Sequence, residues 1–271
     1  MFDGLLLSLL SASKTSKEPL NVTILTGDFS KLNASYLPLE NFEADFLQSV
    51  IKKHNKDSVL ELRDVSELIK GELAETANLD NEYTPYCLMR SFLDLLENIP
   101  SRVLYLDCDT IIMRDISKFF HTDLGDNDIG CVLDKAHAGL FKRHYFNAGV
   151  MLMDLEKIRH DGLMVTSREL IATKKMKHPD QDAMNKIFSK AKKIAYFPRD
   201  YNEQRRLSAS TVIRHFAPQL VFFPLPHIIN VKPWDYANVH NVYHYKEFDH
   251  LFKEAAQLKK EFSLANADKF K

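Results

Sequence analysis

The protein has 271 residues, of which 45% are hydrophobic and 27% are charged, and its formal net charge is -1. This balance is typical of a globular chain with enough apolar mass for a sizeable core, in one large domain or two small ones. The near-neutral charge argues against a general nucleic-acid binder, which usually carries a basic excess. No apolar run reaches the roughly 18 residues that a membrane-spanning helix needs.

Helical and strand patterns alternate along the first half of the chain. Pro85 suits the first turn of a long amphipathic helix, because proline has no amide hydrogen to lose there. The expected helices cover residues 2–12, 42–54, 84–99 and the first part of 66–83. The expected strands cover residues 22–26, 58–65 and 103–106.

The alternation continues in the second half of the chain. Strands are expected at residues 129–133, 150–153, 194–197 and 212–216, and helices within 154–174, 180–190 and 246–262. The pattern predicts an α/β domain with a mostly parallel sheet, in which ligands bind beyond the carboxyl ends of the strands. Because such domains commonly open with a strand and this chain opens with a helix, we expect the first strand of the sheet to be missing.

The cysteines and glycines argue against several common kinds of site. Cys87, Cys108 and Cys131 form no CxxC pair, which indicates a reducing cytoplasm and no disulfide or zinc framework. The 8 glycines form neither a dinucleotide fingerprint nor a P-loop. If the protein binds a phosphate group, it must therefore do so without a glycine-rich loop of either kind.

An acidic pair directly follows the expected strand at residues 103–106. Asp107 and Asp109 are two residues apart, so in an extended chain both carboxylates face one side and could reach one cation. Hard carboxylate oxygens suit Mg²⁺ or Mn²⁺, with diphosphate oxygens completing the shell. A polar strand end or an Asx turn would give the same pair without any function.

The run Val103–Thr110 (VLYLDCDT) has two functional interpretations. It is similar to the DxD motif of nucleotide-sugar glycosyltransferases and to the hhhhDxDxT motif of haloacid dehalogenase-like phosphatases. In the phosphatase, Asp107 would be the nucleophile that forms an aspartyl-phosphate. Such enzymes carry the motif near the N-terminus and need a later acidic pair at a strand end. Here the best later acidic group, at residues 180–182, enters a helix, which weakens the phosphatase interpretation.

Further segments resemble, in order, the elements of glycosyltransferase family 8. These segments are Thr84–Arg90 (TPYCLMR), Tyr145–Asp154 (YFNAGVMLMD), Asp180–Asn185 (DQDAMN), Phe197–Asn202 (FPRDYN), Val212–Phe216 (VIRHF) and Lys232–Trp234 (KPW). The chain is thus similar to the bacterial galactosyl- and glucosyltransferases of lipopolysaccharide and other glycans.

The resemblance implies a GT-A fold over residues 1–245, a Rossmann-like mixed sheet flanked by helices, with residues 246–271 as an amphipathic helical tail. It implies a retaining transfer of glucose or galactose from UDP-glucose or UDP-galactose to a hydroxyl of a glycan, a lipopolysaccharide or another sugar acceptor. The expected cofactor is Mn²⁺ or Mg²⁺. We expect no nucleic-acid partner and a cytoplasmic location. For basic C-terminal residues such as Lys259, a solvated helix face is the favoured interpretation, and peripheral contact with the inner membrane face is the alternative.

The resemblance also assigns roles to single residues. The implied metal ligands are Asp107, Asp109 and His215. The implied substrate-binding residues are Arg90, Asp107, Asp134, Asn147, Asp180, Gln181 and Lys232, the last as a diphosphate contact. The implied catalytic residues are Gln181, Asp180 and Asp134, and we favour same-face attack in which the Gln181 carbonyl stabilises the developing charge.

Two departures from the family pattern bear on function. A long insert at residues 216–231 separates His215 from Lys232, and within it His227 competes with His215 as the third metal ligand. The chain also begins just past the strand that would grip the nucleotide. A non-catalytic sugar-nucleotide-binding module is therefore a third interpretation.

Overall fold

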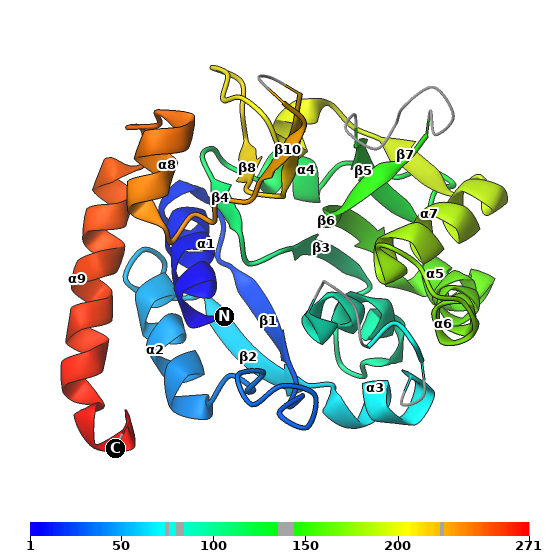
Figure 1. The fold of residues 1–271 in the computed structure, drawn as a ribbon, viewed down its shortest axis with the longest axis horizontal. Helices are drawn as coiled ribbons and strands as arrows, with labels where there is room; N and C mark the ends of the chain where they lie inside the picture. The colour runs from blue at the N-terminus through cyan, green and yellow to red at the C-terminus, as the bar shows by residue number, and fades with distance from the viewer. Residues whose placement is uncertain (74–75, 80–83, 135–143, 223–224, 271) are drawn as a thin grey trace.

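A computed structural model describes residues 1–73, 76–79, 84–134, 144–222 and 225–270, in which helices and strands alternate (Figure 1). The α-helices are α1 (Phe2–Thr15), α2 (Asn41–Lys52), α3 (Ser66–Leu73), α4 (Ser117–Phe120), α5 (Leu155–Asp161), α6 (Leu163–Thr173), α7 (Pro179–Ala191), α8 (Tyr236–Tyr243) and α9 (Asp249–Ala265). The 3₁₀ helices are η1 (Pro85–Leu95), η2 (Arg199–Asn202) and η3 (Ala267–Phe270).

The strands of the described residues form small sheets rather than one continuous sheet. They are β1 (Asn21–Thr26), β2 (Val59–Asp64), β3 (Arg102–Leu106), β4 (Thr110–Ile112), β5 (Ile129–Leu133), β6 (Phe146–Asp154), β7 (Ile194–Tyr196), β8 (Ile213–His215), β9 (Gln219–Val221) and β10 (His227–Ile229). The central sheet has the order β3-β6-β5-β7, and β1-β2, β4-β8 and β9-β10 form pairs.

The mixed α/β architecture confirms the expected fold class, but the strand directions differ from a mostly parallel sheet. Among the described strands, only β1 with β2 and β5 with β7 run parallel. The partners β3–β6, β5–β6, β4–β8 and β9–β10 are antiparallel. Antiparallel neighbours need no crossover helix, and the sequence predicts none between the strands at residues 129–133 and 150–153.

Two of the hydrophobic clusters pack on the two faces of β6, whose residues are all buried except the last. Helices α3, α5, α6 and α7 gather on the right of Figure 1 beside this central sheet, and α1, α2, α8 and α9 gather on the left. This arrangement leaves the ends of β3 and β6 in the middle of the molecule, where the acidic pair follows β3.

The first and last long helices share one core. Leu6, Leu7 and Leu10 of α1 belong to one buried cluster with Leu251 and Leu258 of α9, and each such leucine contributes roughly 2 kcal/mol of hydrophobic stabilisation. The expected helix at residues 246–262 is therefore present and packed. The division of the chain at residue 245 stays a prediction, and so does the missing first strand.

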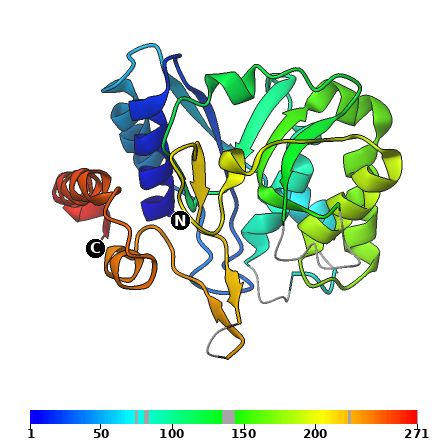
Figure 2. The same ribbon diagram turned by 90° about the horizontal axis from the view of Figure 1, so that it is seen from above.

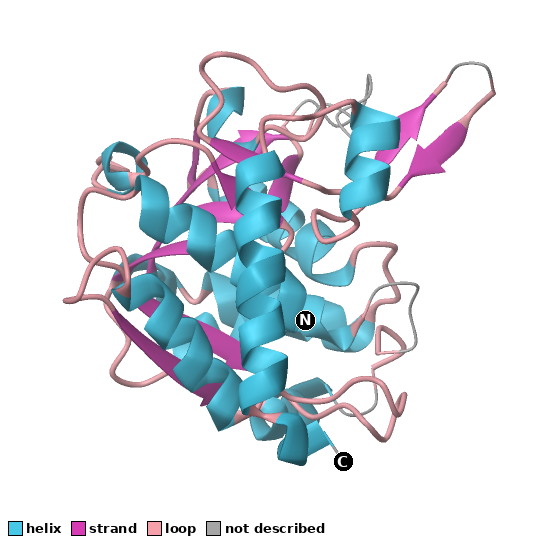
Figure 3. Cartoon of the chain, turned by 90° about the vertical axis from the view of Figure 1, so that its left-hand side faces the viewer, coloured by secondary structure: helices cyan, strands magenta, loops and turns pink. Residues whose placement is uncertain are grey.

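The insert at residues 216–231 contains the antiparallel hairpin of β9 and β10, which the sequence patterns did not predict. The hairpin projects from the body of the molecule in two views (Figures 2 and 3). Among the described residues, no helix is both long and apolar enough to cross a membrane. The expected cytoplasmic location stays a prediction.

Candidate functional site

The acidic pair and His215 are brought together by two short strands. Asp107 follows β3, and its backbone N–H donates to Gly149 O of β6 at 2.8 Å. The chain then enters β4, which pairs with β8 so that Thr110 lies opposite His215. Residues far apart in the sequence therefore meet at the end of the central sheet.

These three side chains form a cluster that could hold a metal ion. His215 Nε2 lies 3.1 Å from Asp109 Oδ1 and 3.8 Å from Asp107 Oδ2, and the three ligand atoms lie within 4.8 Å of one another. Asp109 Oδ1 is buried and accepts no hydrogen bond of good geometry. Two carboxylates and one imidazole suit Mn²⁺ or Mg²⁺, so the residues present fit the expected cofactor.

His227 takes no part in this cluster. It lies on β10 with an exposed side chain, and its Nδ1 lies 2.8 Å from Leu225 O within the hairpin. The structure thus brings His215, and not His227, to the acidic pair.

The orientation of His215 is set by Asn202, to which the sequence assigned no role. His215 Nδ1 lies 3.0 Å from Asn202 Oδ1, and Asn202 Nδ2 donates to Asn147 Oδ1 at 3.0 Å. With the amide oriented in this way, Asn202 holds the proton on His215 Nδ1, which leaves Nε2 as the nitrogen that faces the cluster and could bind a metal. Asn147, expected to bind substrate, is therefore also part of the support for His215.

The backbone comes unusually close to the cluster at Gly149. A Cβ atom at this position would lie 2.2 Å from His215 Cε1 and 2.6 Å from Asp107 Oδ2. Only glycine leaves room for both side chains. Gly149 and Asn202 stand in the family-like segments, so the signal for both was present although no role was assigned.

Lys232 lies beside the cluster, as the resemblance implied. Its Nζ donates to Asp109 Oδ2 at 2.6 Å and to Phe216 O at 3.3 Å. Burial alone would raise the pKa of the Asp109 carboxyl, but the neighbouring His215 and Lys232 outweigh burial and hold that pKa below its ordinary value. Asp109 is therefore ionised and ready to bind a cation.

Arg90 connects the acidic pair to α7. This buried side chain lies on η1, with Nη2 3.0 Å from Asp107 Oδ1 and Nε 3.0 Å from Asp180 Oδ2. Its guanidinium also stacks over the Tyr105 ring, and Tyr105 Oη donates to Asp107 Oδ1 at 2.8 Å. Burial raises the pKa of Asp180, against the opposing effect of Arg90.

Gln181 lies next to Asp180 in the first turn of α7 and faces β6. Its Oε1 accepts from Ala148 N at 2.9 Å, and its Nε2 donates to Tyr145 Oη at 3.1 Å. Asp134 follows β5, is buried, and donates its backbone N–H to Tyr145 O at 2.8 Å. All the expected site residues thus lie around the ends of β3, β5 and β6 or on the elements that contact them.

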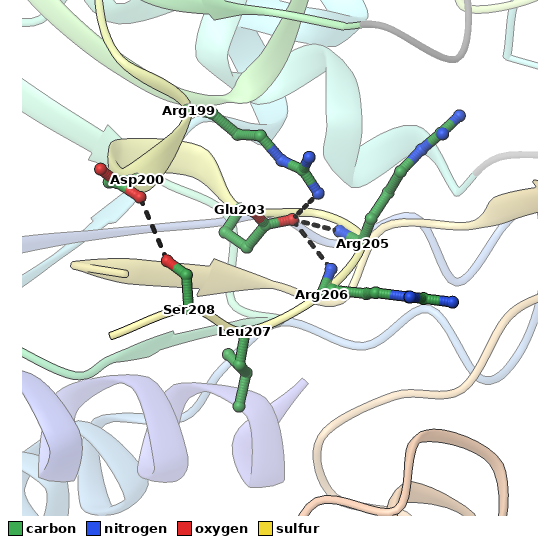
Figure 4. A pocket seen from close by; sticks show the side chains of 7 residues that line it. All are labelled: Arg199, Asp200, Glu203, Arg205, Arg206, Leu207 and Ser208. Atoms are coloured by element: carbon green, nitrogen blue, oxygen red, sulfur yellow. Dashed lines mark hydrogen bonds and ion pairs between the residues drawn. The ribbon is translucent and has the colours of Figure 1, made fainter. Parts of the chain in front are cut away.

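Two hollows adjoin this cluster. The smaller hollow has a volume of about 50 Å³, and its lining includes Asp134, Asn202, Arg199, Arg205 and residues 218–220. Arg199 and Arg205 also line a larger, open hollow of about 570 Å³, which is shown in Figure 4. The larger hollow contains none of the expected site residues, so it lies beside the candidate site rather than over it.

Similarity to known proteins covers most of the chain. A family model described as Glycosyl transferase family 8 matches residues 4–244. The chain is 26% identical over 204 residues to a probable glycosyl transferase Gly of Streptococcus gordonii, which covers 73% of this chain and 28% of that protein. It is 33% identical over 113 residues to the lipopolysaccharide 1,2-glucosyltransferase of Escherichia coli (strain K12), which covers 37% of this chain and 33% of the enzyme. The chain thus spans a third or less of the length of these two relatives.

Solved structures share the fold. A crystal structure of an active-site mutant of LgtC superposes with a TM-score of 0.65 at 19% identity, over 94% of this chain and 91% of that chain. The glycosyltransferase GlyE of Streptococcus pneumoniae TIGR4 superposes with a TM-score of 0.56 at 18% identity, over 93% of this chain and 60% of that chain. The shared architecture is the GT-A fold that the sequence predicted.

Proposed function

The chain belongs to glycosyl transferase family 8, and on this premise we propose that it is a metal-dependent, retaining hexosyltransferase. Its donor is UDP-glucose or UDP-galactose, and its acceptor is a hydroxyl of a glycan, a lipopolysaccharide or another sugar. The observation that supports this most is the cluster of Asp107, Asp109 and His215 with Lys232 beside it. Such an arrangement would offer a diphosphate both a bound cation and a fixed positive charge.

The three clustered side chains would hold Mn²⁺ or Mg²⁺. When bound, the divalent cation supplies positive charge that offsets the charge of the UDP diphosphate. Lys232 adds a second positive charge from the protein itself. As the bond from the sugar C1 to the diphosphate oxygen breaks, negative charge grows on UDP, and an ammonium already in place stabilises it without reorganisation.

The surroundings of Asp180 favour same-face attack over a covalent intermediate. A nucleophilic carboxylate must present a free oxygen to the sugar C1. Asp180 is buried and pairs with Arg90 at 3.0 Å, which lowers its nucleophilicity. Gln181 remains as the group whose carbonyl would stabilise the positive charge on the sugar, held in place by Ala148 N and Tyr145 Oη. We assign Asp134, Asn147 and Arg90 to the binding of the donor.

The phosphatase alternative lacks support from the surroundings of Asp107. An aspartyl nucleophile needs an oxygen free to attack phosphorus, whereas Asp107 Oδ1 accepts from Tyr105 and pairs with Arg90. Its Oδ2 faces His215 in the cluster. Because the chain belongs to a glycosyltransferase family, we do not propose the phosphatase activity. The non-catalytic module is tested by the experiment below.

The test combines binding and turnover. We expect UDP to raise the unfolding midpoint only when Mn²⁺ is present, because a ligand at about 100 times its Kd stabilises the native state by roughly 2.7 kcal/mol. UDP-glucose and UDP-galactose are then compared for release of UDP. Binding without turnover on any donor would favour the non-catalytic module, and absence of both would overturn the proposal.

A matched pair of variants separates the site from general charge effects. Asp109→Asn removes one charge from the cluster, and Asp57→Asn removes one from an exposed carboxylate in the turn between α2 and β2. We expect only Asp109→Asn to abolish the metal-dependent shift. Equal behaviour of the two variants would contradict the assignment of the metal site.

A further inference from the structure

The hairpin of β9 and β10 exposes an unusual amount of apolar surface. Phe222, Leu225 and Ile228 are 70%, 74% and 67% exposed, and Leu220 is 43% exposed. Residues 216–231 contain no Asp, Glu, Lys or Arg. A two-stranded hairpin is only marginally stable in water, so a projecting one with bare apolar side chains calls for a covering surface.

The exposed side chains gather at one end of the hairpin. Leu220 and Ile228 are opposite each other in the strand register, so they share one face. Phe222 and Leu225 lie beyond the last paired residues, at the end that points away from the body (Figures 2 and 3). The apolar surface is thus a narrow tip and not a broad patch.

Two arginines stand beside the base of the hairpin. Glu203 is buried, and its Oε1 accepts from the Arg199 guanidinium and from the backbone N–H groups of Arg205 and Arg206, at 2.5, 2.6 and 3.0 Å. Figure 4 shows the side chains of Arg205 and Arg206 extending away from Glu203. Both side chains are exposed, and neither guanidinium has an ion-pair partner among the described residues.

The position of these arginines relative to the hairpin follows from contacts. Gln219 Nε2 donates to Gln204 O, the residue that precedes Arg205, and Arg205 lines the small hollow together with Leu220. The hairpin therefore carries an uncharged apolar tip and free positive charge at its base. Anionic lipid headgroups complement that charge, and the acyl region beneath them complements the tip.

We propose that the β9–β10 hairpin, with Arg205 and Arg206 at its base, docks the protein on an anionic lipid bilayer. A protein partner fits less well, because a standard interface buries about 800 Å² on each side and two three-residue strands offer far less. Leu220 lines the same small hollow as Asp134 and Asn202, so docking brings the lipid surface next to the candidate site. This inference goes beyond the proposed hexosyl transfer and does not depend on it.

The experiment measures co-sedimentation of the full chain with vesicles of phosphatidylcholine alone or mixed with phosphatidylglycerol. We expect strong binding to the mixed vesicles and a loss of about tenfold or more in Phe222→Ser/Leu225→Ser, since both side chains leave water on docking. Arg205→Gln/Arg206→Gln should lose up to about 25-fold on mixed vesicles, about fivefold per arginine, and little on neutral ones.

The controls carry the same changes elsewhere. Leu264→Ser removes another exposed apolar side chain, on α9, and Lys253→Gln/Lys260→Gln removes two exposed charges from the same helix. Both controls should bind vesicles as the parent does. The proposal is wrong if the parent fails to bind mixed vesicles, or if the controls lose as much binding as the hairpin variants.

Two further measurements distinguish a lipid surface from a protein interface and from the catalytic site. Sedimentation velocity that shows a dimer lost in Phe222→Ser/Leu225→Ser, without vesicle binding, would assign the hairpin to a protein interface and overturn the proposal. UDP release in solution should be unchanged in that variant, because its side chains lie outside the site. Failure of donor turnover in the parent would refute the proposed function while leaving the vesicle result to decide this inference.

Discussion

Asn202 fixes the imidazole of His215 through a 3.0 Å contact between Asn202 Oδ1 and His215 Nδ1, on the side of the ring opposite the acidic pair. His215 Nε2 is thereby directed at Asp109 Oδ1, 3.1 Å away. Asn202 in turn donates to Asn147, so a chain of buried amides aligns the only nitrogen ligand of the cluster. Such partners orient ligands and tune their affinity for a metal.

Asn202→Ala should weaken Mn²⁺ binding by about 10- to 100-fold, the usual effect of removing a group that orients a metal ligand. The imidazole would keep its place on β8 but lose the partner that sets its tautomer. Calorimetric titration with Mn²⁺ measures the change. Asn266→Ala, which removes a single amide hydrogen bond to Phe262 O at the end of α9, is the control. Equal affinity in Asn202→Ala and the parent would show that His215 needs no such support.

Gly149→Ala should disturb the cluster without touching its ligands. The added methyl group would overlap His215 and Asp107, so both side chains or the β6 backbone must shift. We expect loss of metal-dependent UDP binding and a fall of about 1 to 3 kcal/mol in the free energy of unfolding, as for other overpacked sites. Urea unfolding and the UDP/Mn²⁺ thermal shift measure the two effects. Gly71→Ala meets no atom within 4 Å and lies in α3, so it should leave UDP binding unchanged and should not lower the free energy of unfolding, because alanine favours a helix. Normal UDP binding by Gly149→Ala would contradict the close approach.

The buried Asp128 offers a test of pH dependence outside the site. Both carboxylate oxygens lack a hydrogen bond, and burial raises the pKa of Asp128 against the effect of Lys193, 3.4 Å away. The folded protein therefore holds this proton more tightly than the unfolded chain. Stability from this group is then lost as the pH rises from the unfolded pKa, near 3.8, through the raised folded pKa.

Asp128→Asn should accordingly gain stability relative to the parent as the pH rises. The gain is about 1.4 kcal/mol for each unit by which folding raises the pKa. Urea unfolding gives the stability difference between the variant and the parent at about pH 4 and again at about pH 7. The change in this difference between the two pH values measures the gain, because the cost of burying the amide is the same at both and cancels. Asp57→Asn should show no such trend. A relative loss of stability at the higher pH would mean that Lys193 outweighs burial.

Local sequence patterns predicted the strand that leads into the acidic pair. They did not predict the pairing of β4 with β8, which brings the histidine to it. The run at residues 103–106 is recognisable as a strand from its own residues, and the acidic pair at its end follows directly. The choice between His215 and His227 depends on the register of β4 with β8, two strands of three residues each. Segments of that length carry no periodicity, so only their tertiary pairing reveals which histidine meets Asp109.

The insert at residues 216–231 shows a second limit of sequence patterns. Its apolar residues and prolines gave no alternating pattern, and a run of this kind is equally typical of buried core. The structure places Leu225 and Ile228 in solvent because the hairpin leaves the body of the molecule. Composition alone cannot separate a core segment from an exposed apolar tip, since both consist of the same residues.

Lys232→Gln should change metal binding and catalysis in opposite directions. The ammonium lies 2.6 Å from Asp109 Oδ2 and competes with a divalent cation for that oxygen. Unit charges about 4 Å apart interact by roughly 4 kcal/mol at an effective dielectric constant of 20, so recovery of a third of this repulsion strengthens Mn²⁺ binding about tenfold. UDP release from the donor should fall by about 100-fold, because the leaving diphosphate loses a fixed positive charge. Titration with Mn²⁺ and donor turnover are measured on one preparation of the variant, and Lys253→Gln serves as the control. If Lys232→Gln loses both Mn²⁺ affinity and turnover, Lys232 has a structural role instead.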